Sequence, residues 1–491
     1  MQSDKAETHT PSRKKNDSLA TRVIHLVGAG GSGMSGLAMM MHGLGARVSG
    51  SDAQLGPEIE ALVAADLTVT TGKSNGTLPD ECDLAIHSAA VPPDHPELLE
   101  AQRRDIEVLS YAEALGRLQS ERTGISIAGT HGKSTTSALL AHTLIQAGLD
   151  PNVIVGARCP QIGGGWRVGE DRIPGDGPLA GREGLMICEA CEFNRSFHHH
   201  RPVLALINNI EEDHLDIYGG LEEIVEAFHV FAQLIPDADQ GGYLLIAHEG
   251  AHRREVTAGL NCCVETFGFT PESDWRISLE HGRVTIHDRN GSRVASWESP
   301  MIGTHNAMNA AAAAILAHRS GAEWNVIAEA IASFAGLDRR MQMLGRRRLP
   351  DGGHMVVFDD YGHHPTEVET TLRALRTTHD PKRLICVFQP HQHSRTRFLL
   401  DHFATSFDHA DIVIVPQIYF VRDSEAERQR VSASDLVERL RHRGTRAMHV
   451  HPFEAIVEQL EVIGRDGDLV VVMGAGPVWQ IGHQLLELEE A

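Results

Sequence analysis

A loop of glycine, lysine and hydroxyl residues carries the side chains best suited to chemistry in this chain. Its members are Gly129, Thr130, His131, Gly132, Lys133, Ser134 and Thr135. Glycines let backbone N–H groups turn toward an anion, a lysine neutralises terminal phosphates, and a serine hydroxyl can ligate Mg²⁺. The spacing departs from GxxxxGK(S/T), whose first glycine would fall at Ile127, but a β-rich run precedes the loop and a helix-forming run follows it. The loop therefore predicts a bound nucleoside triphosphate, ATP or GTP.

Acidic residues follow the next two strand-like runs. The run LMICEA contains Glu189 at its end, and the run VLALINN leads into Glu211, Glu212, Asp213 and His214. Carboxylates at the end of a strand parallel to the phosphate-loop strand commonly hold the Mg²⁺ of a nucleotide. The second group could be a metal site or a solvated acidic turn, and the residues alone leave both interpretations open.

A second glycine turn lies near the start of the chain. Gly28, Gly30 and Gly33 fit GxGxxG after an apolar strand, and Asp52 follows at the end of the next strand. An acid at that place holds a ribose in dinucleotide enzymes, so a nicotinamide or flavin site is one interpretation. A tight turn that packs a helix on a sheet is the other.

Ionisable residues also follow two apolar runs in the last third of the chain. They are residues 359–364 after one run and residues 391–397 after the next. In a doubly wound parallel sheet, ligands bind just past such strand ends. Upstream, an alanine-rich helix carries Asn306 and Asn309 on one face because they stand three positions apart. The run Arg346–Arg348 is most simply interpreted as an exposed turn.

These groups belong to three blocks of alternating strands and helices. We predict an α/β protein with a Rossmann-like N-terminal domain, a central P-loop-type ATPase domain with a mainly parallel sheet, and a C-terminal doubly wound α/β domain. Residues 275–298 alternate and predict antiparallel strands. A length of 491 residues fits three domains, and the expected boundaries are a disordered tail at 1–20 and domains at 21–120, 121–336 and 337–491.

The amino-acid composition limits the classes of partner that the protein can bind. The 44 Lys+Arg against 66 Asp+Glu give a net charge of −22, which argues against a nucleic-acid surface because phosphate backbones demand a basic footprint. Seven cysteines, an odd number, favour reduced thiols over a disulfide framework. The N-terminus has no signal-peptide core, and no run reaches the ~18 apolar residues of a membrane span. We therefore expect a cytoplasmic protein without membrane contact.

Eight motifs, in order along nearly the whole chain, resemble one family. They are GAGGSGMSG, GTHGKSTT, EACEFNRSF, NNIEEDHLDIYG, GTHNAMNAAAA, GLDRRMQMLG, DDYGHHPTEV and FQPHQHSRTR. This set resembles the Mur ligases, ATP-dependent amide ligases of bacterial cell-wall synthesis, and most of all the branch that joins L-alanine to UDP-N-acetylmuramate. The resemblance implies peptidoglycan synthesis through an acyl phosphate, with ATP, Mg²⁺ and two small-molecule substrates. It leaves the oligomeric state open, monomer or dimer.

The resemblance also implies roles for individual residues. Catalysis would fall to Lys133, Glu189, His214 and Arg340, and Mg²⁺ binding to Ser134, Glu189 and His214. ATP would contact the glycine–lysine loop together with Asn306, Asn309, Arg340 and Asp360. The UDP-linked substrate would contact Gly28, Gly30, Gly31, Ser32, Gly33, Met34, Asp52 and Ser88. The incoming amino acid would contact Tyr361, His363, His391 and Arg395.

Two motifs depart from the usual pattern of that family. Gln392 and His393 stand where arginine and tyrosine are common, and the loss of a guanidinium that can pair with a carboxylate leaves the amino-acid preference open. Cys191 and Asn194 replace acids beside Glu189. Three alternatives remain: a sister ligase that adds another amino acid or a preformed peptide, a nicotinamide oxidoreductase, and a nucleotide-regulated binding protein without turnover.

Overall fold

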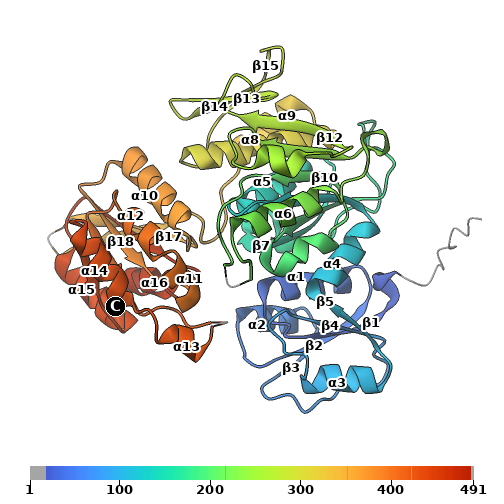
Figure 1. Ribbon diagram of the computed structural model, residues 1–491, viewed down its shortest axis with the longest axis horizontal. Coiled ribbons are helices and arrows are strands. Elements are labelled where there is room, and N and C mark those ends of the chain that lie inside the picture. The colour runs from blue at the N-terminus through green and yellow to red at the C-terminus, as the bar shows by residue number, and fades with distance from the viewer. Residues whose placement is uncertain (1–17, 216, 351, 422, 488–491) are drawn as a thin grey trace, which may run out of the picture. The chain divides into compact units, whose positions relative to one another are not determined.

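The computed structural model describes residues 18–215, 217–350, 352–421 and 423–487. The chain divides into two compact units, residues 1–121 and 122–491, coloured along the chain in Figure 1. Of the predicted N-terminal tail, residues 1–17 lie outside the described residues, and a 3₁₀ turn at Leu19–Thr21 follows with Leu19 buried. In the described part of the chain, no helix is both long enough and apolar enough to cross a bilayer.

The first unit is built on a parallel sheet in the order β3-β2-β1-β4-β5. Its inner strands β1 and β4 are apolar and largely buried, as expected for a parallel sheet covered by helices. The strands are β1 (Val23–Val27), β2 (Arg47–Asp52), β3 (Thr68–Thr71), β4 (Leu84–His87) and β5 (Glu107–Ser110). The helices are α1 (Ser32–Gly43), α2 (Pro57–Ala64), α3 (Pro96–Arg103) and α4 (Tyr111–Ser120). This arrangement confirms the Rossmann-like prediction.

The second unit contains two sheets, and the first has the order β15-β14-β13-β12-β11-β10-β6-β9-β7-β8. It is parallel from β13 to β7, whereas β8, β14 and β15 pair in antiparallel fashion. The alternation of residues 275–298 thus predicted antiparallel strands correctly. The strands are β6 (Thr123–Ala128), β7 (Asn152–Cys159), β8 (Gly164–Arg167), β9 (Leu185–Ala190), β10 (Pro202–Ile207), β11 (Tyr243–Ala247), β12 (Cys263–Gly268), β13 (Trp275–Glu280), β14 (Arg283–His287) and β15 (Arg293–Glu298).

Helices α5 and α8 form the core beside this sheet. The alanines of α8 are fully buried and share one hydrophobic cluster with α5, and their short side chains let the two helices approach closely. This packing brings Asn309 to the beginning of α5, where the glycine–lysine loop ends. The helices are α5 (Lys133–Gln146), α6 (Leu221–Ala232), α7 (Arg253–Thr257), α8 (Thr304–Arg319) and α9 (Trp324–Ala332), with 3₁₀ turns at Pro160–Ile162, Phe193–His199 and Ala238–Gln240.

The C-terminal sheet has the order β16-β17-β21-β18-β19-β20 and is parallel except for β16. Helices α10, α12 and α14 pack in one hydrophobic cluster on one face, and α15 and α16 pack in another on the opposite face, which confirms the doubly wound prediction. The interpretation of Arg346–Arg348 as a turn is wrong, because these residues end the antiparallel edge strand β16. The strands are β16 (Gln342–Arg348), β17 (His354–Asp360), β18 (Arg383–Phe388), β19 (Ile412–Val415), β20 (Arg446–His449) and β21 (Asp468–Met473). The helices are α10 (Pro365–His379), α11 (His393–Phe398), α12 (Leu400–Thr405), α13 (Glu425–Arg428), α14 (Ala433–His442), α15 (Phe453–Ile463) and α16 (Trp479–Glu487).

Candidate active site

The glycine–lysine loop joins the buried strand β6 to the first residue of α5, Lys133. Gly129 and Gly132 have positive φ angles of 136° and 81°, which favour glycine. A Cβ at Gly132 would lie 2.4 Å from the side-chain oxygen of Asn309, and one at Gly129 would lie 3.0 Å from the Cβ of Asn208. The loop therefore needs glycine for conformation and for space, and its N–H groups stand at a helix start that favours anions.

The ammonium group of Lys133 is held at this loop. It donates to the carbonyl oxygen of Gly129 at 2.6 Å and pairs with a carboxylate oxygen of Glu192 at 3.0 Å. Burial opposes the charge of Lys133, but the attraction of Glu192 outweighs it and raises the pKa of Lys133. The lysine is therefore a fixed positive charge. The sequence reasoning missed Glu192, although it lies in the motif that contains Glu189.

Two of the three predicted Mg²⁺ ligands lie together. The hydroxyl of Ser134 donates to one carboxylate oxygen of Glu189 at 3.1 Å, and the backbone N–H of Gly156 donates to the other at 2.7 Å. Burial raises the pKa of Glu189. A divalent cation would offset the burial of this charge, and carboxylate and hydroxyl oxygens are the donors that Mg²⁺ prefers, so the residues fit that ion.

The third predicted ligand, His214, belongs to a neighbouring cluster. Ligand atoms of His214, Glu192 and Asp213 all lie within 4.8 Å of one another. Because Glu192 also pairs with Lys133, the phosphate loop and this cluster share one carboxylate. The run of acids after β10 is therefore a partly buried cluster rather than a solvated turn.

The four predicted amino-acid contacts gather past the ends of β17 and β18. Arg395 donates to the ring nitrogen Nδ1 of His391 at 3.2 Å, and the rings of His391 and His363 lie 5.9 Å apart, centre to centre. The ring of Tyr361 lies 5.5 Å from that of His363. Burial lowers the pKa of His363 to about 4, so its imidazole is neutral near pH 7. The guanidinium of Arg395 pairs with Asp213 at 3.0 Å, and this ion pair joins the cluster to the acids after β10.

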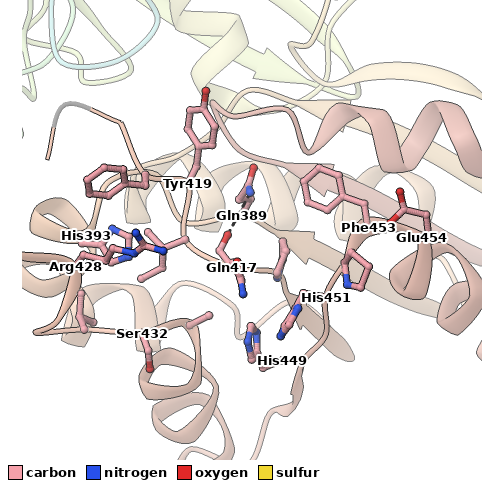
Figure 2. Close-up of a pocket in the computed structure, with 16 residues that line it drawn as sticks. Gln389, His393, Gln417, Tyr419, Arg428, Ser432, His449, His451, Phe453 and Glu454 are labelled. Atoms are coloured by element: carbon pink, nitrogen blue, oxygen red, sulfur yellow. Dashed lines mark hydrogen bonds between the residues drawn. The ribbon is translucent and has the colours of Figure 1, made fainter. Parts of the chain in front are cut away.

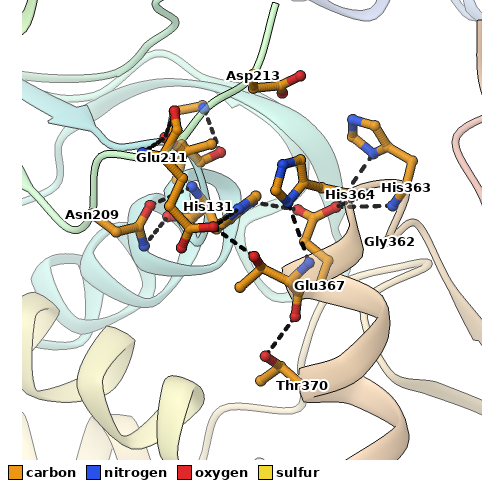
Figure 3. Close-up of polar contacts among 12 residues, drawn as sticks. His131, Asn209, Glu211, Asp213, Gly362, His363, His364, Glu367 and Thr370 are labelled. Carbon is orange, nitrogen blue, oxygen red and sulfur yellow. Dashed lines mark hydrogen bonds and ion pairs between the residues drawn. The ribbon is translucent and has the colours of Figure 1, made fainter. Parts of the chain in front are cut away.

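Glu367 connects the phosphate loop to the same C-terminal cluster (Figure 3). One of its oxygens lies 3.2 Å from Nδ1 of His131 and 3.9 Å from the guanidinium of Arg340, and the other accepts the backbone N–H of His363 at 2.9 Å. His131 lies 3.5 Å from Glu211 on its other side. Burial opposes protonation of His131, but the two carboxylates outweigh it and raise its pKa to about 9. Glu367 lies in the motif DDYGHHPTEV, but its contact with His131 was not predicted, because the two residues are 236 positions apart.

The remaining residues that we predict to contact ATP are held by contacts within the protein. Asp360 accepts the N–H groups of Met341 and Gly362, each at 2.7 Å, and burial raises its pKa to about 6. Arg340 lies over the ring of Tyr361, 4.9 Å from its centre. Asn309 donates to the side-chain oxygen of Asn306 at 3.3 Å, and its own oxygen accepts from the Thr136 hydroxyl at 3.3 Å.

The predicted UDP-substrate residues form a compact turn in the first unit. The N–H of Gly30 donates to the carboxylate of Asp52 at 2.7 Å, so Asp52 supports the turn directly. Gly28 has a φ of 79°, and a Cβ there would lie 3.1 Å from the Cβ of Ser88. Gly31 precedes α1 without a side-chain cap, Ser32 begins the helix, and Met34 is buried. The turn thus presents an open helix N-terminus, an arrangement that suits a phosphate group.

The chain matches three family models in succession. They are described as the Mur ligase family catalytic domain over residues 23–123, the Mur ligase middle domain over 178–317, and the Mur ligase glutamate ligase domain over 339–476. A UDP-N-acetylmuramate–L-alanine ligase of Solidesulfovibrio magneticus is 36% identical over 472 residues, which cover 95% of this chain and 98% of that protein. The chain belongs to the Mur ligase family. An enzyme of the same name from Geobacter sulfurreducens is also 36% identical, over 95% of this chain and 98% of its own.

Solved structures of Mur ligases share the fold. A UDP-N-acetylmuramate-alanine ligase of Thermotoga maritima superposes with a TM-score of 0.74 at 23% identity, over 96% of this chain and 99% of the other. A murein peptide ligase of Psychrobacter arcticus gives a TM-score of 0.69 at 25% identity, over 95% and 98%. The family resemblance, the fold class and the ligase class are thus confirmed. Because the chain is a Mur ligase, we no longer interpret the first glycine turn as a dinucleotide site. The roles of single residues and the domain boundaries stay predictions.

Proposed function

We propose that this protein is an ATP-dependent ligase that joins L-alanine to UDP-N-acetylmuramate in cytoplasmic peptidoglycan synthesis. The observation that carries the proposal is the Asp213–Arg395 ion pair at 3.0 Å, together with the Glu367–His131 contact at 3.2 Å. These contacts hold a phosphate-binding loop beside a cluster suited to an amino acid. Relatives that match along nearly the whole chain bear the name of this ligase.

The first step activates a carboxylate. An amine cannot displace oxygen from a free carboxylate, because the oxygen is a poor leaving group. A carboxylate oxygen of the muramic acid attacks the γ-phosphorus of ATP, the bond between that phosphorus and the bridging oxygen breaks, and ADP leaves with the electron pair. Lys133, a fixed positive charge at the loop, stabilises the negative charge on the transferred phosphoryl group.

The second step forms the amide bond. The amino nitrogen of alanine attacks the carbonyl carbon of the acyl phosphate and releases a proton. The tetrahedral intermediate collapses, the carbon–oxygen bond to phosphate breaks, and inorganic phosphate leaves. Arg395 and His391 are the groups that we assign to the alanine carboxylate, because a guanidinium keeps its positive charge and its NH1 group, beside His391, can donate to a carboxylate.

Ser134 and Glu189 would hold Mg²⁺, and His214 with Glu192 offers a second group of donors. When bound, the ion supplies positive charge that screens the phosphates and the attacking carboxylate from each other. Glu192 contacts Lys133 and Glu189 contacts Ser134, so both carboxylates lie beside the loop at which we expect the phosphates to bind.

The test is a reconstituted reaction. The purified chain is mixed with ATP, Mg²⁺, UDP-N-acetylmuramate and alanine, serine, glycine or a preformed peptide in turn, and phosphate and UDP-linked product are measured. We expect alanine to be preferred, and ¹⁸O from the muramic carboxylate to appear in the released phosphate. Product without ¹⁸O transfer would contradict the acyl phosphate, and turnover with the peptide alone would favour a sister ligase.

Lys133→Ala and Glu189→Ala should abolish turnover, because the loop then lacks its ammonium group or its metal-binding carboxylate. Lys382→Ala is the matched control, since this lysine is exposed and pairs with Asp466 on the C-terminal sheet. We expect it to keep full activity. Wild-type turnover in either loop variant would remove our assignment of the catalytic centre.

A further inference from the structure

The C-terminal sheet has a second crevice, separate from the residues assigned above to ATP and alanine. Strand β19 leads to α14 on one face of the sheet, whereas its neighbour β20 leads to α15 on the opposite face. When two neighbouring parallel strands are followed by helices on opposite faces of the sheet, the chain diverges after the carboxyl ends of these strands. The crevice that this leaves outside the strand ends is a common place for a ligand to bind. The predicted ligase residues follow β17 and β18 instead. The crevice at β19 and β20 therefore needs an explanation of its own.

A cavity of about 730 Å³ lies at these strand ends (Figure 2). Pockets of this size hold ligands larger than alanine. Three aromatic side chains line it: Tyr419, Phe420 and Phe453. Tyr419 is 36% exposed and Phe420 is 41% exposed, although large aromatic side chains are usually buried. The cavity thus offers flat apolar surfaces that stay open to solvent.

Cationic and donor groups line the same cavity. The guanidinium of Arg428 lies over the ring of Phe420, 5.4 Å from its centre. His449 donates from Nδ1 to the carbonyl oxygen of Val415 at 2.8 Å, which directs its other ring nitrogen elsewhere, and His451 lies 5.2 Å away, ring to ring (Figure 2). The first turn of α15 has no side-chain cap. These groups can hold an anion on a chain whose net charge is −22.

Hydrogen-bond acceptors complete the lining. Gln389 is 5% exposed and donates to the carbonyl oxygen of Gln417 at 3.2 Å, but among the described residues its own side-chain oxygen has no hydrogen-bond partner. Glu454, in the first turn of α15, also lines the cavity. Within the described part of the chain, Nδ1 of the buried His393 also lacks a hydrogen-bond partner. Both atoms are enclosed by protein, since the Gln389 oxygen lies beside Gly476 and His393 Nδ1 lies 3.7 Å from Asp423, so Glu454 is the acceptor that this set offers to the cavity.

We propose that this cavity binds a nucleoside phosphate at a site separate from the glycine–lysine loop. The base stacks on Phe420, Tyr419 or Phe453, and its N–H groups meet the acceptor Glu454. The phosphate meets Arg428, His449 and His451. A nucleotide combines a flat base, an anionic phosphate and N–H donors. Each kind of group that lines the cavity therefore has a partner in the ligand.

The site is connected to the amino-acid cluster through Tyr419. The carbonyl oxygen of Tyr419 accepts the N–H of Gln392 at 3.1 Å, and its ring lies 5.7 Å from that of His391, centre to centre. His391 in turn contacts Arg395. A base that stacks on Tyr419 therefore changes the surroundings of the residues assigned to alanine. We expect occupancy to alter the KM for alanine more than the KM for ATP.

The proposal is tested by calorimetric titration of the full-length Lys133→Ala variant with AMP, adenosine and inorganic phosphate. This background should weaken nucleotide binding at the loop, and AMP lacks the uridine that we expect the turn of the first unit to bind. We expect saturable AMP binding that Phe420→Ala and Arg428→Ala each weaken about tenfold. Phe269→Ala, an aromatic residue exposed to 38%, and Arg443→Ala, an arginine paired with Asp408, are the matched controls and should leave it unchanged.

Absence of AMP binding at millimolar concentrations would overturn the proposal. So would AMP binding that the two pocket variants leave unchanged, because the nucleotide would then occupy another site. Adenosine that binds as well as AMP would contradict the role of the cations, and phosphate that binds as well would contradict the role of the rings. Since the titration needs no turnover, its failure would leave the proposed ligase activity untouched.

Discussion

Replacing Glu367 by glutamine tests the contact between the phosphate loop and the C-terminal cluster. Glutamine keeps the shape of the side chain and an oxygen that can accept the N–H of His363, but it removes the charge that faces His131 at 3.2 Å. The variant therefore removes the ion pair and preserves the packing of the side chain. We expect it to lower the thermal stability of the protein near neutral pH and to leave the fold intact.

The size of the effect follows from the pKa of His131. Two carboxylates, Glu367 and Glu211, raise this pKa from 6.5 to about 9, which corresponds to roughly 3 kcal/mol of stabilisation of the protonated ring. Half of that amount, about 1–2 kcal/mol, is the share of Glu367, because the two carboxylates flank the ring on either side. With an unfolding entropy of roughly 2.1 cal/mol/K per residue, a loss of this size lowers the melting midpoint of the unit at residues 122–491 by roughly 1–3 °C.

The sign of the pH dependence is fixed by the direction of the shift. Because the folded-state pKa of His131 is raised, its stabilisation is fully present below pH 6.5 and is lost as the pH rises through about 9. We therefore expect the difference in melting midpoint between wild type and Glu367→Gln to be largest near pH 6 and to shrink toward pH 10. Differential scanning calorimetry at several pH values measures it.

Glu369→Gln provides the matched control, since Glu369 lies on the same helix and pairs near the surface with Arg373 at 3.4 Å and with the half-exposed His409 at 3.5 Å. Exposed ion pairs of this kind contribute little to the free energy of unfolding. The melting midpoint of the control should therefore equal that of wild type at every pH. A difference between wild type and Glu367→Gln that is equal at pH 6 and pH 10 would refute the reasoning. The stabilisation would then come from the backbone N–H groups and not from His131.

Three further substitutions test other parts of the site. Gly132→Ala places a Cβ 2.4 Å from the oxygen of Asn309, so ATP binding measured by titration should weaken at least about tenfold, whereas Gly148→Ala, also at positive φ but with no atom within 4 Å, should keep it. Asp213→Asn leaves a buried guanidinium without its charge partner, so denaturant unfolding should show a loss of about 3–5 kcal/mol, and unchanged stability would show that the ion pair contributes nothing. Gln392→Arg should sharpen the preference for alanine over serine and glycine in the product assay, and an unchanged ranking would contradict a role for position 392 in selectivity.

Much of the fold could be predicted from the sequence, because the central strands of the parallel sheets, such as β6, β18 and β21, are short apolar runs bounded by turn residues. The edge strand β16 was missed for a physical reason. Its residues Arg346 to Arg348 alternate between half-buried and exposed positions, and an edge strand needs no apolar face to be paired on one side.

The predictable part of the site is the part that is local in the chain. Ser134 stands beside Lys133 in one loop, and the Gly30–Asp52 contact joins neighbouring strands of one βαβ unit. In contrast, the partners His131 and Glu367 are 236 positions apart, and Asp213 and Arg395 are 182 apart. No periodicity or spacing rule relates residues at such separations, so only the folded structure reveals these pairs.

The ion pair between Asp213 and Arg395 has a consequence for work with fragments of this protein. A piece that ended before the C-terminal sheet would keep the whole glycine–lysine loop, yet Glu211, Asp213 and Glu192 would face it without the arginine and histidine groups contributed from further along the chain. Such an acidic surface repels a triphosphate. Nucleotide affinity measured on that fragment would therefore understate the affinity of the intact enzyme, and inhibitors screened against it would be selected for the wrong electrostatic environment.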